Sequence, residues 1–538
     1  MRKYILRIFR IIFSVIVFVL FFLIFVNFEF LPKELTNKVL STQFVPSILK
    51  SLSVGKIVAS AFIFIIILTI LTGRTYCSFL CPLGISQDIN SWLGARIRKK
   101  FKRYGYKKPH NLLRYTILVV VLGVTILSGN HLLVLLDPYS IFGRIMTFFV
   151  KPVAIVLNNF AASIMDKFNI YSLSHITIEG YPLITYMLPL AFFVLIFSFS
   201  LAKGRLYCNT FCPVGAFLGL LSKISLFRVK IDKSKCTKCG RCAVACKSSC
   251  MDSVNNKIDI TRCVNCFDCV SICSGRALHY GFVFGGSPDE KKEEKDTVTS
   301  NATDTEVKST KNETIERREF VTASVAMLLG MPTLLKAQDV VSQSPLASSI
   351  EEVKSFPVCP PGAGNMDSFN SKCTACSLCI NICPTGVLRP SLLEYGVFGM
   401  LQPVMNYKKG FCSYNCNACV EICPTGALSP ATVEAKQMMK LGVVQFVKDN
   451  CVVKLGKTAC GACSESCPTK AVYMVPYEGN LLIPEINPDI CIGCGHCEYA
   501  CPMTPYKAIY VDGLERQVVI EKKTDDKPAV NVLDDFPF

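Results

Sequence analysis

The sequence predicts an α-helical membrane domain followed by small α+β domains, and two observations lead to this fold class. Hydrophobic residues make up 51% of the 538 residues, which is too apolar for a chain that is soluble throughout. The chain also has 30 cysteines, far more than core packing uses, and most of them fall into groups of four. The apolar runs lie in the first part of the chain and most cysteine groups lie in the last part, so we expect separate domains.

Four cysteine quartets, each followed by proline, occupy the C-terminal part. They are Cys373, Cys376, Cys379 and Cys383; Cys412, Cys416, Cys419 and Cys423; Cys451, Cys460, Cys463 and Cys467; and Cys491, Cys494, Cys497 and Cys501. The first and fourth have the C-x2-C-x2-C-x3-C-P spacing of bacterial ferredoxins, in which three thiolates hold one [4Fe–4S] cube and the fourth reaches a neighbouring cube. The second and third are stretched, with three residues in one gap and eight in another. Structural zinc sites usually take paired CxxC motifs or add histidine, and a disulfide framework does not explain four repeats that end in Cys-Pro. We therefore predict a four-cluster module over residues 341–513, with residues 514–538 as a tail.

Apolar runs predict four membrane spans within residues 1–228. They lie at about residues 11–28, 57–71, 115–136 and 183–202, each close to the length that crosses hydrocarbon. The loop between the second and third spans is rich in Lys and Arg, whereas the loop before it has few, which places both ends of the domain in the cytoplasm. A further apolar stretch, residues 141–165, is interrupted by Arg144, Lys151 and Pro152. We expect it to be interfacial or re-entrant on the outer face of a bacterial inner membrane.

The membrane domain contains an internal repeat. GRTYCSFLCPLG (residues 73–84) and GRLYCNTFCPVG (residues 204–215) each follow a span that runs inward. Cysteines four apart share one side of a helix, so the two motifs could present Cys77, Cys81, Cys208 and Cys212 to one another. Four such thiols suffice for a metal or a cluster, or for two redox dithiols. The alternative is two helix ends that merely use small residues and a proline stop, but recurrence of the whole pattern favours a function.

Other cofactors and partners have no support in the sequence. The net charge of +18 lies largely beside apolar segments, where it orients a membrane protein, so we expect no nucleic-acid partner. No C-x-x-C-H motif occurs for a c-type haem. Among the five histidines only His131 lies in or at the end of a span, which leaves no axial pair for an intramembrane haem, and we interpret it as an interfacial residue. No P-loop or strand-flanked G-x-G-x-x-G is present.

A second cysteine-rich module, residues 229–283, follows the membrane domain. Its two quartets are Cys236, Cys239, Cys242 and Cys246, and Cys263, Cys266, Cys269 and Cys273. The spacing predicts a cytoplasmic two-cluster ferredoxin with cross-over ligation from Cys246 and Cys273, although Lys247 and Ser274 stand where proline is usual. Cys250 and Cys359 belong to no quartet, and the sequence assigns them no role.

Two segments separate the cysteine-rich modules. Residues 284–316 have too few large apolar side chains to form a core and are expected to be a disordered linker. In residues 317–340, Arg317, Arg318 and Phe320 precede a short apolar stretch, which is typical of a twin-arginine export signal, either cleaved or retained as a membrane anchor. Proteins that acquire clusters in the cytoplasm must cross the membrane folded, so we predict a periplasmic location for the four-cluster module. The alternative is an amphipathic segment that leaves the module inside.

Both halves resemble known ferredoxin-type proteins. Residues 1–280, with four spans, paired CxxxCP motifs and a two-cluster domain, resemble the NapH-type membrane ferredoxins. Residues 317–513 resemble the exported NapG-type partner, and Pro360-Pro361-Gly362-Ala363 is similar to a segment ahead of that family's first quartet. The resemblance implies a natural fusion of two subunits associated with quinol oxidation and electron delivery to periplasmic nitrate reductase and related enzymes. It also implies nested ligation: Cys373, Cys376 and Cys379 with Cys501; Cys491, Cys494 and Cys497 with Cys383; and exchange of Cys423 and Cys467 between the inner quartets.

The sequence therefore predicts α-helical membrane and α+β bacterial-ferredoxin-type domains, one two-cluster and one four-cluster, with six [4Fe–4S] clusters in all. A further metal or cluster at the CxxxCP motifs remains open. The expected function is electron transfer from quinol, as a quinol dehydrogenase component, or from a cytoplasmic donor to a periplasmic reductase or cytochrome. The alternative is a membrane ferredoxin that acts in metallo-oxidase maturation or copper reduction. Six clusters in series favour electron transfer, because a metal chaperone needs no long chain of clusters.

Overall fold

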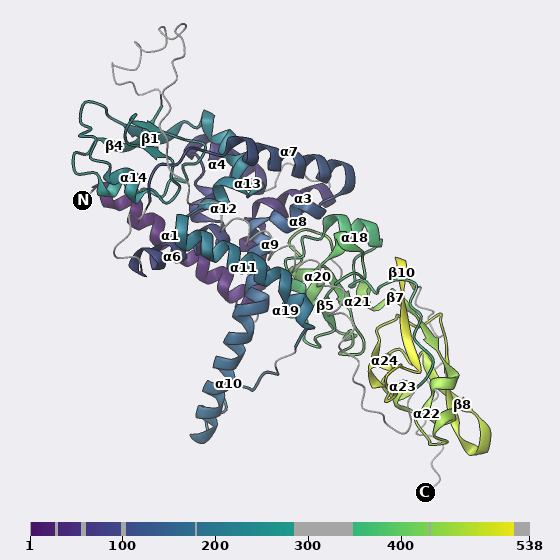
Figure 1. Cartoon of the computed structure of the whole chain (residues 1–538). Coiled ribbons are helices and arrows are strands. Elements are labelled where there is room, and N and C mark those ends of the chain that lie inside the picture. The colour runs from purple at the N-terminus through teal and green to yellow at the C-terminus, as the bar shows by residue number, and fades with distance from the viewer. Residues whose placement is uncertain are drawn as a thin grey trace, which may run out of the picture.

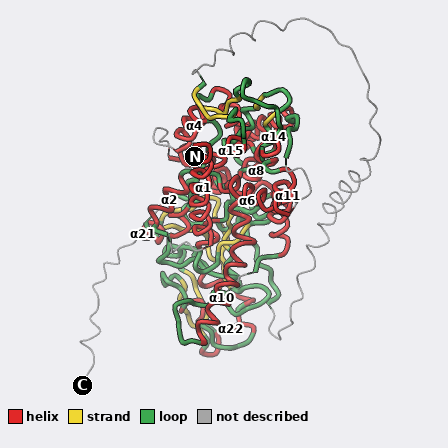
Figure 2. Tube along the Cα trace, turned by 90° about the vertical axis from the view of Figure 1, so that its left-hand side faces the viewer, coloured by secondary structure: helices red, strands yellow, loops and turns green. Residues whose placement is uncertain are grey.

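The computed structural model describes residues 2–26, 31–54, 61–97, 104–177, 180–283, 348–429 and 432–520. Within these ranges a helical domain lies between two cysteine-rich modules (Figure 1). We call residues 227–283 the inner module and residues 348–520 the outer module. The strands gather in these two modules and most of the long helices lie between them (Figure 2). The expected linker and export signal, and the tail beyond residue 520, lie outside the described residues.

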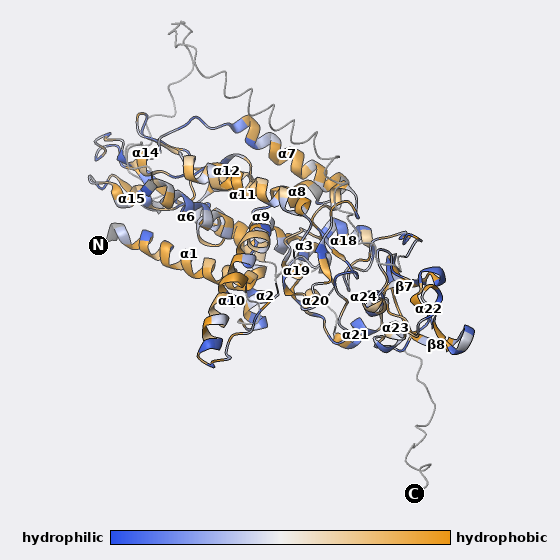
Figure 3. Ribbon diagram, turned by 60° about the horizontal axis from the view of Figure 1, so that its bottom comes forward, coloured by the Kyte–Doolittle hydropathy of each residue, from blue (hydrophilic) through white to orange (hydrophobic). Residues whose placement is uncertain are grey.

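Four helices run between the two modules, in the order that the sequence predicts. They are α1 (Arg2–Val26), α4 (Ala61–Thr72), α7 (Asn111–Ser128) and α11 (Leu183–Lys203). At one end of this bundle Arg7 pairs with Asp268 of the inner module at 2.9 Å. At the other end the Asn130 side chain donates to the Ser371 carbonyl of the outer module. The helices are apolar along most of their length (Figure 3).

Three helices in the described part of the chain are long and apolar enough to cross a membrane, namely Tyr4–Val26, Pro138–Lys167 and Leu183–Lys203. The first and third coincide with expected spans. The expected spans at 57–71 and 115–136 correspond to the shorter helices α4 and α7.

The second of these helices is continuous, whereas the sequence suggested that Arg144, Lys151 and Pro152 interrupt residues 141–165. Helix α9 (Pro138–Ile145), a π-helical turn η2 (Met146–Val150) and α10 (Lys151–Lys167) form one continuous helix. Pro152 does not break it, because the proline stands in the first turn of α10, directly after the π-helical turn. A wider turn of this kind accommodates a proline that an α-helix interior would not.

Each CxxxCP motif forms a short helix, a break at the second cysteine and a longer helix. The first motif gives α5 (Tyr76–Phe79) and α6 (Pro82–Ile97), and the second gives α12 (Leu206–Thr210) and α13 (Pro213–Leu221). Pro82 and Pro213 are the first residues of their helices, where a missing N–H costs nothing. The remaining helices of this domain are α2 (Lys33–Ser41), α3 (Phe44–Val54) and α8 (His131–Leu136).

The inner module is built on antiparallel strand pairs. Strand β1 (Phe227–Ile231) pairs with β4 (Leu278–Phe282), and β2 (Met251–Asp252) pairs with β3 (Lys257–Ile258). Two short helices, α14 (Arg241–Ala245) and α15 (Asp268–Ile272), pack against each other between the pairs.

The outer module is also built on antiparallel strand pairs and short helices. Its strand pairs are β5 (Leu388–Pro390) with β6 (Pro403–Met405), β7 (Met439–Phe446) with β10 (Ile509–Val519), and β8 (Val472–Pro476) with β9 (Leu482–Ile486). Its helices are α18 (Met366–Lys372), α19 (Leu378–Ile382), α20 (Ala418–Ile422), α21 (Val433–Gln437), α22 (Val452–Leu455), α23 (Ala462–Glu465) and α24 (His496–Ala500). Strand β10 continues to Val519, so the module extends past residue 513, where we expected the tail to begin.

Candidate iron–sulfur sites and a buried four-thiol centre

The thiols of the outer module gather in four groups, each made of three cysteines from one quartet and one from another. The groups are Cys373, Cys376 and Cys379 with Cys423; Cys412, Cys416 and Cys419 with Cys383; Cys451, Cys460 and Cys463 with Cys501; and Cys491, Cys494 and Cys497 with Cys467. Burial raises the pKa of the Cys379 thiol, and the nearby Cys423 thiolate raises it further. Burial and the Cys501 thiolate act in the same way on Cys463.

The nested ligation expected from the resemblance is therefore wrong. In the structure the fourth cysteine of each quartet reaches its neighbour in sequence, so the first quartet exchanges with the second and the third with the fourth. The packing of the short helices explains this pairing, because α19 packs on α20 and α23 packs on α24. The outer module is thus two successive units, each with two groups of four thiols.

In the inner module the two quartets also exchange their fourth cysteines, Cys246 and Cys273. Burial raises the pKa of the Cys269 thiol, and so do the Cys266, Cys263 and Cys246 thiolates around it. The other group, Cys236, Cys239 and Cys242 with Cys273, lines a hollow of about 30 Å³. The spare Cys250 is buried with its Sγ 3.4 Å from Cys246 Sγ, so it is a fifth thiol beside the first of these groups.

Buried donors near the first group of the outer module fit a cluster there. Arg144 Nη1 and Ser377 Oγ are buried and have no hydrogen-bond partner among the described residues. A buried donor without an acceptor is costly, and the sulfides of a cube would supply acceptors. Among the described residues, no three His, Cys, Asp or Glu side chains have the spacing that a single metal ion needs. The thiol groups match the four-cysteine donor set of a [4Fe–4S] cube, which when bound supplies one-electron redox chemistry.

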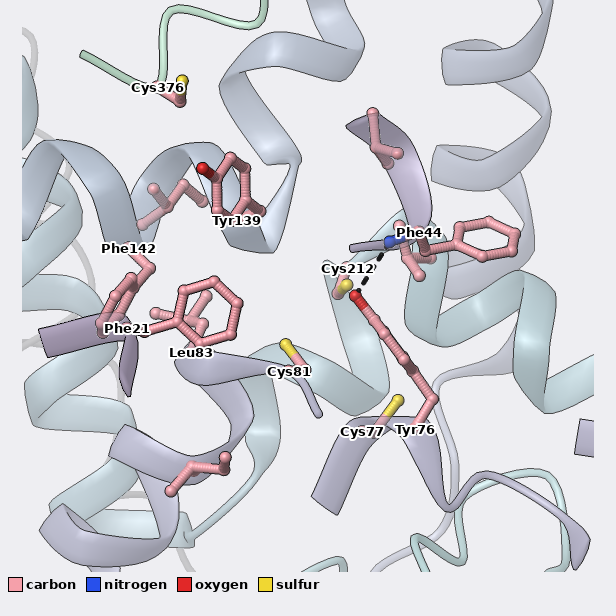
Figure 4. Packing of buried hydrophobic residues seen from close by; sticks show 14 of the residues in the cluster. Phe21, Phe44, Tyr76, Cys77, Cys81, Leu83, Tyr139, Phe142, Cys212 and Cys376 are labelled. Atoms are coloured by element: carbon pink, nitrogen blue, oxygen red, sulfur yellow. Dashed lines mark hydrogen bonds between the residues drawn. The ribbon is translucent and has the colours of Figure 1, made fainter. Parts of the chain in front are cut away.

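The two CxxxCP motifs meet in the core of the helical domain and form what we call the four-thiol centre, Cys77, Cys81, Cys208 and Cys212. The four side chains are 2–5% exposed and belong to one core cluster. Figure 4 shows Cys77, Cys81 and Cys212 around one space, with Tyr139 between that space and Cys376 of the outer module. The sequence predicted that these thiols could face one another, and the structure places them together.

The arginine of each motif donates a hydrogen bond to the backbone of the other motif. Arg205 Nη1 donates to the Cys77 carbonyl at 2.7 Å, and Arg74 Nη2 donates to the Cys208 carbonyl at 3.2 Å. Each motif therefore fixes the backbone of the first cysteine in the other motif. Both arginine side chains are fully buried.

A buried carboxylate neutralises part of this charge. Asp88, on α6, accepts from Arg205 Nε and Nη2, both at 2.8 Å. The same carboxylate accepts from Arg10 of α1 at 2.6 Å, and Lys247 of the inner module lies 3.8 Å away. The network joins α1, α6, the second motif and the inner module. Sequence reasoning missed it, and the signal was an aspartate in an otherwise uncharged stretch after the first motif.

The glycines that end the motifs are required by close approach of the chain. A Cβ atom at Gly84 would overlap the Cys77 carbonyl oxygen, and one at Gly215 would overlap the Cys208 carbonyl oxygen. Any other residue would push the second helix of its motif away from the first. The repeated glycine, arginine and proline positions thus all serve to bring the thiols together, which is why the pattern recurs as a whole.

The four-thiol centre contacts both modules. On the inner side, Ser78 Oγ donates to the Val264 carbonyl at 2.5 Å, and Arg74 Nη1 donates to the Thr261 carbonyl at 2.9 Å. On the outer side, Cys376 belongs to the same core cluster as the four thiols, Phe21 and Tyr139. The centre therefore lies between a thiol group of each module.

The outer module is docked on α9 and the start of α10. Arg144 Nε donates to the Ala375 carbonyl at 3.3 Å, and Lys151 Nζ donates to the Asn381 carbonyl at 2.7 Å. Gly143 allows the close approach, because a Cβ atom there would overlap the Cys376 carbonyl oxygen. We did not foresee this interface, since its partners are backbone carbonyls far away in sequence.

Comparisons with known proteins agree with these sites. A family described as a 4Fe-4S binding domain matches residues 55–101 and 185–234, which contain the two CxxxCP motifs. Families described as 4Fe-4S dicluster domains match residues 372–428 and 458–504. Each dicluster match falls on one pair of neighbouring quartets, in line with the pairing in the structure.

Three relatives illustrate the similarity. The methylamine utilization ferredoxin-type protein MauN of Paracoccus denitrificans is 30% identical over 175 residues, 32% of this chain and 48% of that protein. The ferredoxin-type protein NapH of Haemophilus influenzae is 27% identical over 187 residues, 35% of this chain and 52% of that protein. The ferredoxin-type protein NapF of Escherichia coli K12 is 30% identical over 152 residues, 28% of this chain and 84% of that protein. The chain thus spans about half the length of the MauN and NapH relatives. No solved structure matches the chain.

Proposed function

The chain belongs to the family of ferredoxin-type iron–sulfur proteins, and from this premise we propose that it carries electrons across a bacterial inner membrane. The donor is quinol or a cytoplasmic reductant, and the acceptor is a periplasmic reductase or cytochrome. Its form is a fusion of a NapH-type and a NapG-type unit, with one two-cluster module and one module of two successive two-cluster units.

The position of the two modules at opposite ends of the helical domain carries this proposal. On α1, Arg7 pairs with Asp268 of the inner module, while Phe25 lies in the core cluster that contains Cys376 of the outer module. At 1.5 Å per residue, the helix between these two contacts is about 27 Å long. This length is close to the roughly 30 Å of hydrocarbon in a bilayer, so one module would lie on each side.

Charge supports the assignment of sides. The inner end of the bundle carries a basic hollow of about 140 Å³, lined by Lys107, Lys108, Arg114, Lys203 and Arg262 among others. Basic residues favour the cytoplasmic side, which supports a cytoplasmic inner module and a periplasmic outer module. Export of the outer module would use Arg317 and Arg318, which lie outside the described residues.

The protein residues contribute burial and positive charge to this function. Most thiols of the groups are buried or half-buried, and Arg74 and Arg205 of the helical domain lie between the modules. Positive charge favours the reduced state of an anionic redox centre. The chain would thereby keep redox-active groups on both sides of the membrane within one structure.

A test uses the full chain, with its clusters, in proteoliposomes that receive a menaquinol analogue in a stopped-flow instrument. We expect the visible absorbance of the clusters to bleach, as it does with dithionite. If dithionite bleaches the protein fully and quinol does not, quinol is not the donor. That result would favour a cytoplasmic donor or a role in metallo-oxidase maturation.

A further inference from the structure

We propose that Cys77, Cys81, Cys208 and Cys212 hold a seventh [4Fe–4S] cluster inside the helical domain, between the two ferredoxin modules. Cluster binding is argued from the residues of the four-thiol centre alone. The role of the cluster as a relay rests on the proposed function.

Burial argues against thiol–disulfide exchange at the centre. All four cysteines are free thiols in the structure and at most 5% exposed. Exchange requires an attacking thiolate to reach a sulfur atom, and the surrounding core gives a partner protein no access. Two redox dithiols, the alternative that the sequence left open, would be closed off from their substrates.

The spacing of the thiols argues against a single metal ion. A zinc ion with four Zn–S bonds of about 2.3 Å requires its sulfurs to lie about 3.8 Å apart. No group of three or more potential ligands in the described residues meets the spacing for one ion, although Cys77, Cys81 and Cys212 lie around one space (Figure 4). The thiol groups of the two ferredoxin modules do not meet the spacing for a single ion either. The four-thiol centre therefore resembles the cluster sites, in which a cube holds its thiolates farther apart.

The charge of the surroundings matches a cluster. A [4Fe–4S] core of charge 2+ with four thiolates has a net charge of 2−, which is costly to bury without compensation. The two guanidinium groups of Arg74 and Arg205 lie against the motif backbones. Arg205 and Arg10 share the single carboxylate of Asp88, and Arg114 is buried beside the second motif as well. The buried cations around the centre therefore outnumber the buried carboxylate, which favours an anionic group there.

Donors also point at the sulfur atoms. Gln87 Nε2 lies 3.3 Å from Cys208 Sγ, the Gly215 amide lies 3.3 Å from Cys212 Sγ, and Arg74 Nη2 lies 3.9 Å from Cys77 Sγ. Hydrogen bonds to ligand sulfurs are among the features that set the potential of a cluster. These hydrogen bonds would raise the reduction potential of a cluster here above that of a cluster whose ligand sulfurs accept none. The cluster could then be reduced although the surrounding core has low polarity.

The position of the centre defines its role. Ser78, adjacent to Cys77, contacts Val264 of the inner module, and Tyr139 lies between the centre and Cys376 of the outer module. One electron would arrive from a reduced module and leave to an oxidised one, and no bond or proton changes partner. Electrons could then cross the membrane within the chain.

The test is the iron content of the anaerobically purified full chain, with the spin count by electron paramagnetic resonance after reduction. Seven cubes require about 28 irons per chain, whereas six require about 24. We expect about 28 irons in the unmodified protein and about 24 in Cys77→Ser/Cys208→Ser, with loss of one cluster signal. Cys359→Ser, a buried cysteine outside every group, is the matched control and should keep about 28.

About 24 irons and six cluster spins in the unmodified protein would overturn the proposal, whether or not the double variant folds. The failure of the proposed function would look different. A chain with about 28 irons that quinol does not bleach would retain the seventh cluster and lose the quinol assignment. A chain with about 24 irons that quinol bleaches would lack the seventh cluster and keep the quinol assignment.

Discussion

Replacement of Arg205 by alanine is expected to destabilise the helical domain by about 3 kcal/mol. The fully buried guanidinium makes two hydrogen bonds to Asp88 and one to the Cys77 carbonyl. Removal of one partner from a buried ion pair typically costs about 3–5 kcal/mol, because the other charge stays buried. Arg10 still reaches Asp88 at 2.6 Å, so we place the loss at the lower end of this range.

Equilibrium unfolding of the full chain in detergent, followed by near-ultraviolet circular dichroism, measures this loss. Arg96→Ala is the matched control on the same helix as Asp88. Arg96 is exposed and stacks over Trp92 at 4.0 Å, an interaction worth less than about 1 kcal/mol at the surface. Equal stability of the two variants would show that the Asp88 network does not hold the motifs together.

Replacement of Gly143 by valine is expected to push the outer module away from α9. The new side chain would overlap the Cys376 carbonyl oxygen and crowd the ring of Phe25. Overpacking of this kind costs about 1–3 kcal/mol. If the interface opens to relieve it, amide hydrogens of α19 should exchange roughly 5 to 150 times faster.

Hydrogen–deuterium exchange of the peptide around Ala375–Asn381 measures this change in the full chain. Gly123→Val is the control, because nothing lies within 4 Å of a Cβ atom at Gly123 on α7. It carries the same substitution at a site where the added side chain meets no neighbouring segment. Unchanged exchange at α19 in Gly143→Val would mean that α9 and the outer module do not form the interface described here.

Local features of the sites could be predicted from the sequence, whereas their pairing could not. The spacing of each quartet is a property of one loop, so Cys373–Cys383 could be assigned to clusters without a structure. Which cysteine completes which group depends on how short helices pack, and there the family resemblance led to the wrong, nested pairing. The recurrence of glycine, arginine and proline around Cys77 and Cys208 indicated one site, because every repeated residue has a geometric task.

Features that depend on contacts between distant segments were missed. Where the outer module contacts Gly143 and Arg144, it presents backbone carbonyl oxygens. Every residue has a backbone carbonyl, so the sequence does not indicate which of them are used. Pro152 suggested a broken helix, but the π-helical turn Met146–Val150 accommodates it. Asp88 carried a signal, since a lone carboxylate next to a motif needs a buried cation, although its partners Arg10 and Arg205 are 78 and 117 residues away.

The central claim is that electrons cross the membrane within this chain through the four-thiol centre. Quinone-free proteoliposomes that enclose ferricyanide and receive dithionite outside test it most directly, since neither reagent needs to cross the bilayer. The account predicts that enclosed ferricyanide loses its colour much faster than in protein-free vesicles. It also predicts that Cys77→Ser/Cys208→Ser falls to the protein-free rate while Cys359→Ser does not. A full rate in the double variant, or a protein-free rate in the unmodified chain, would contradict the account.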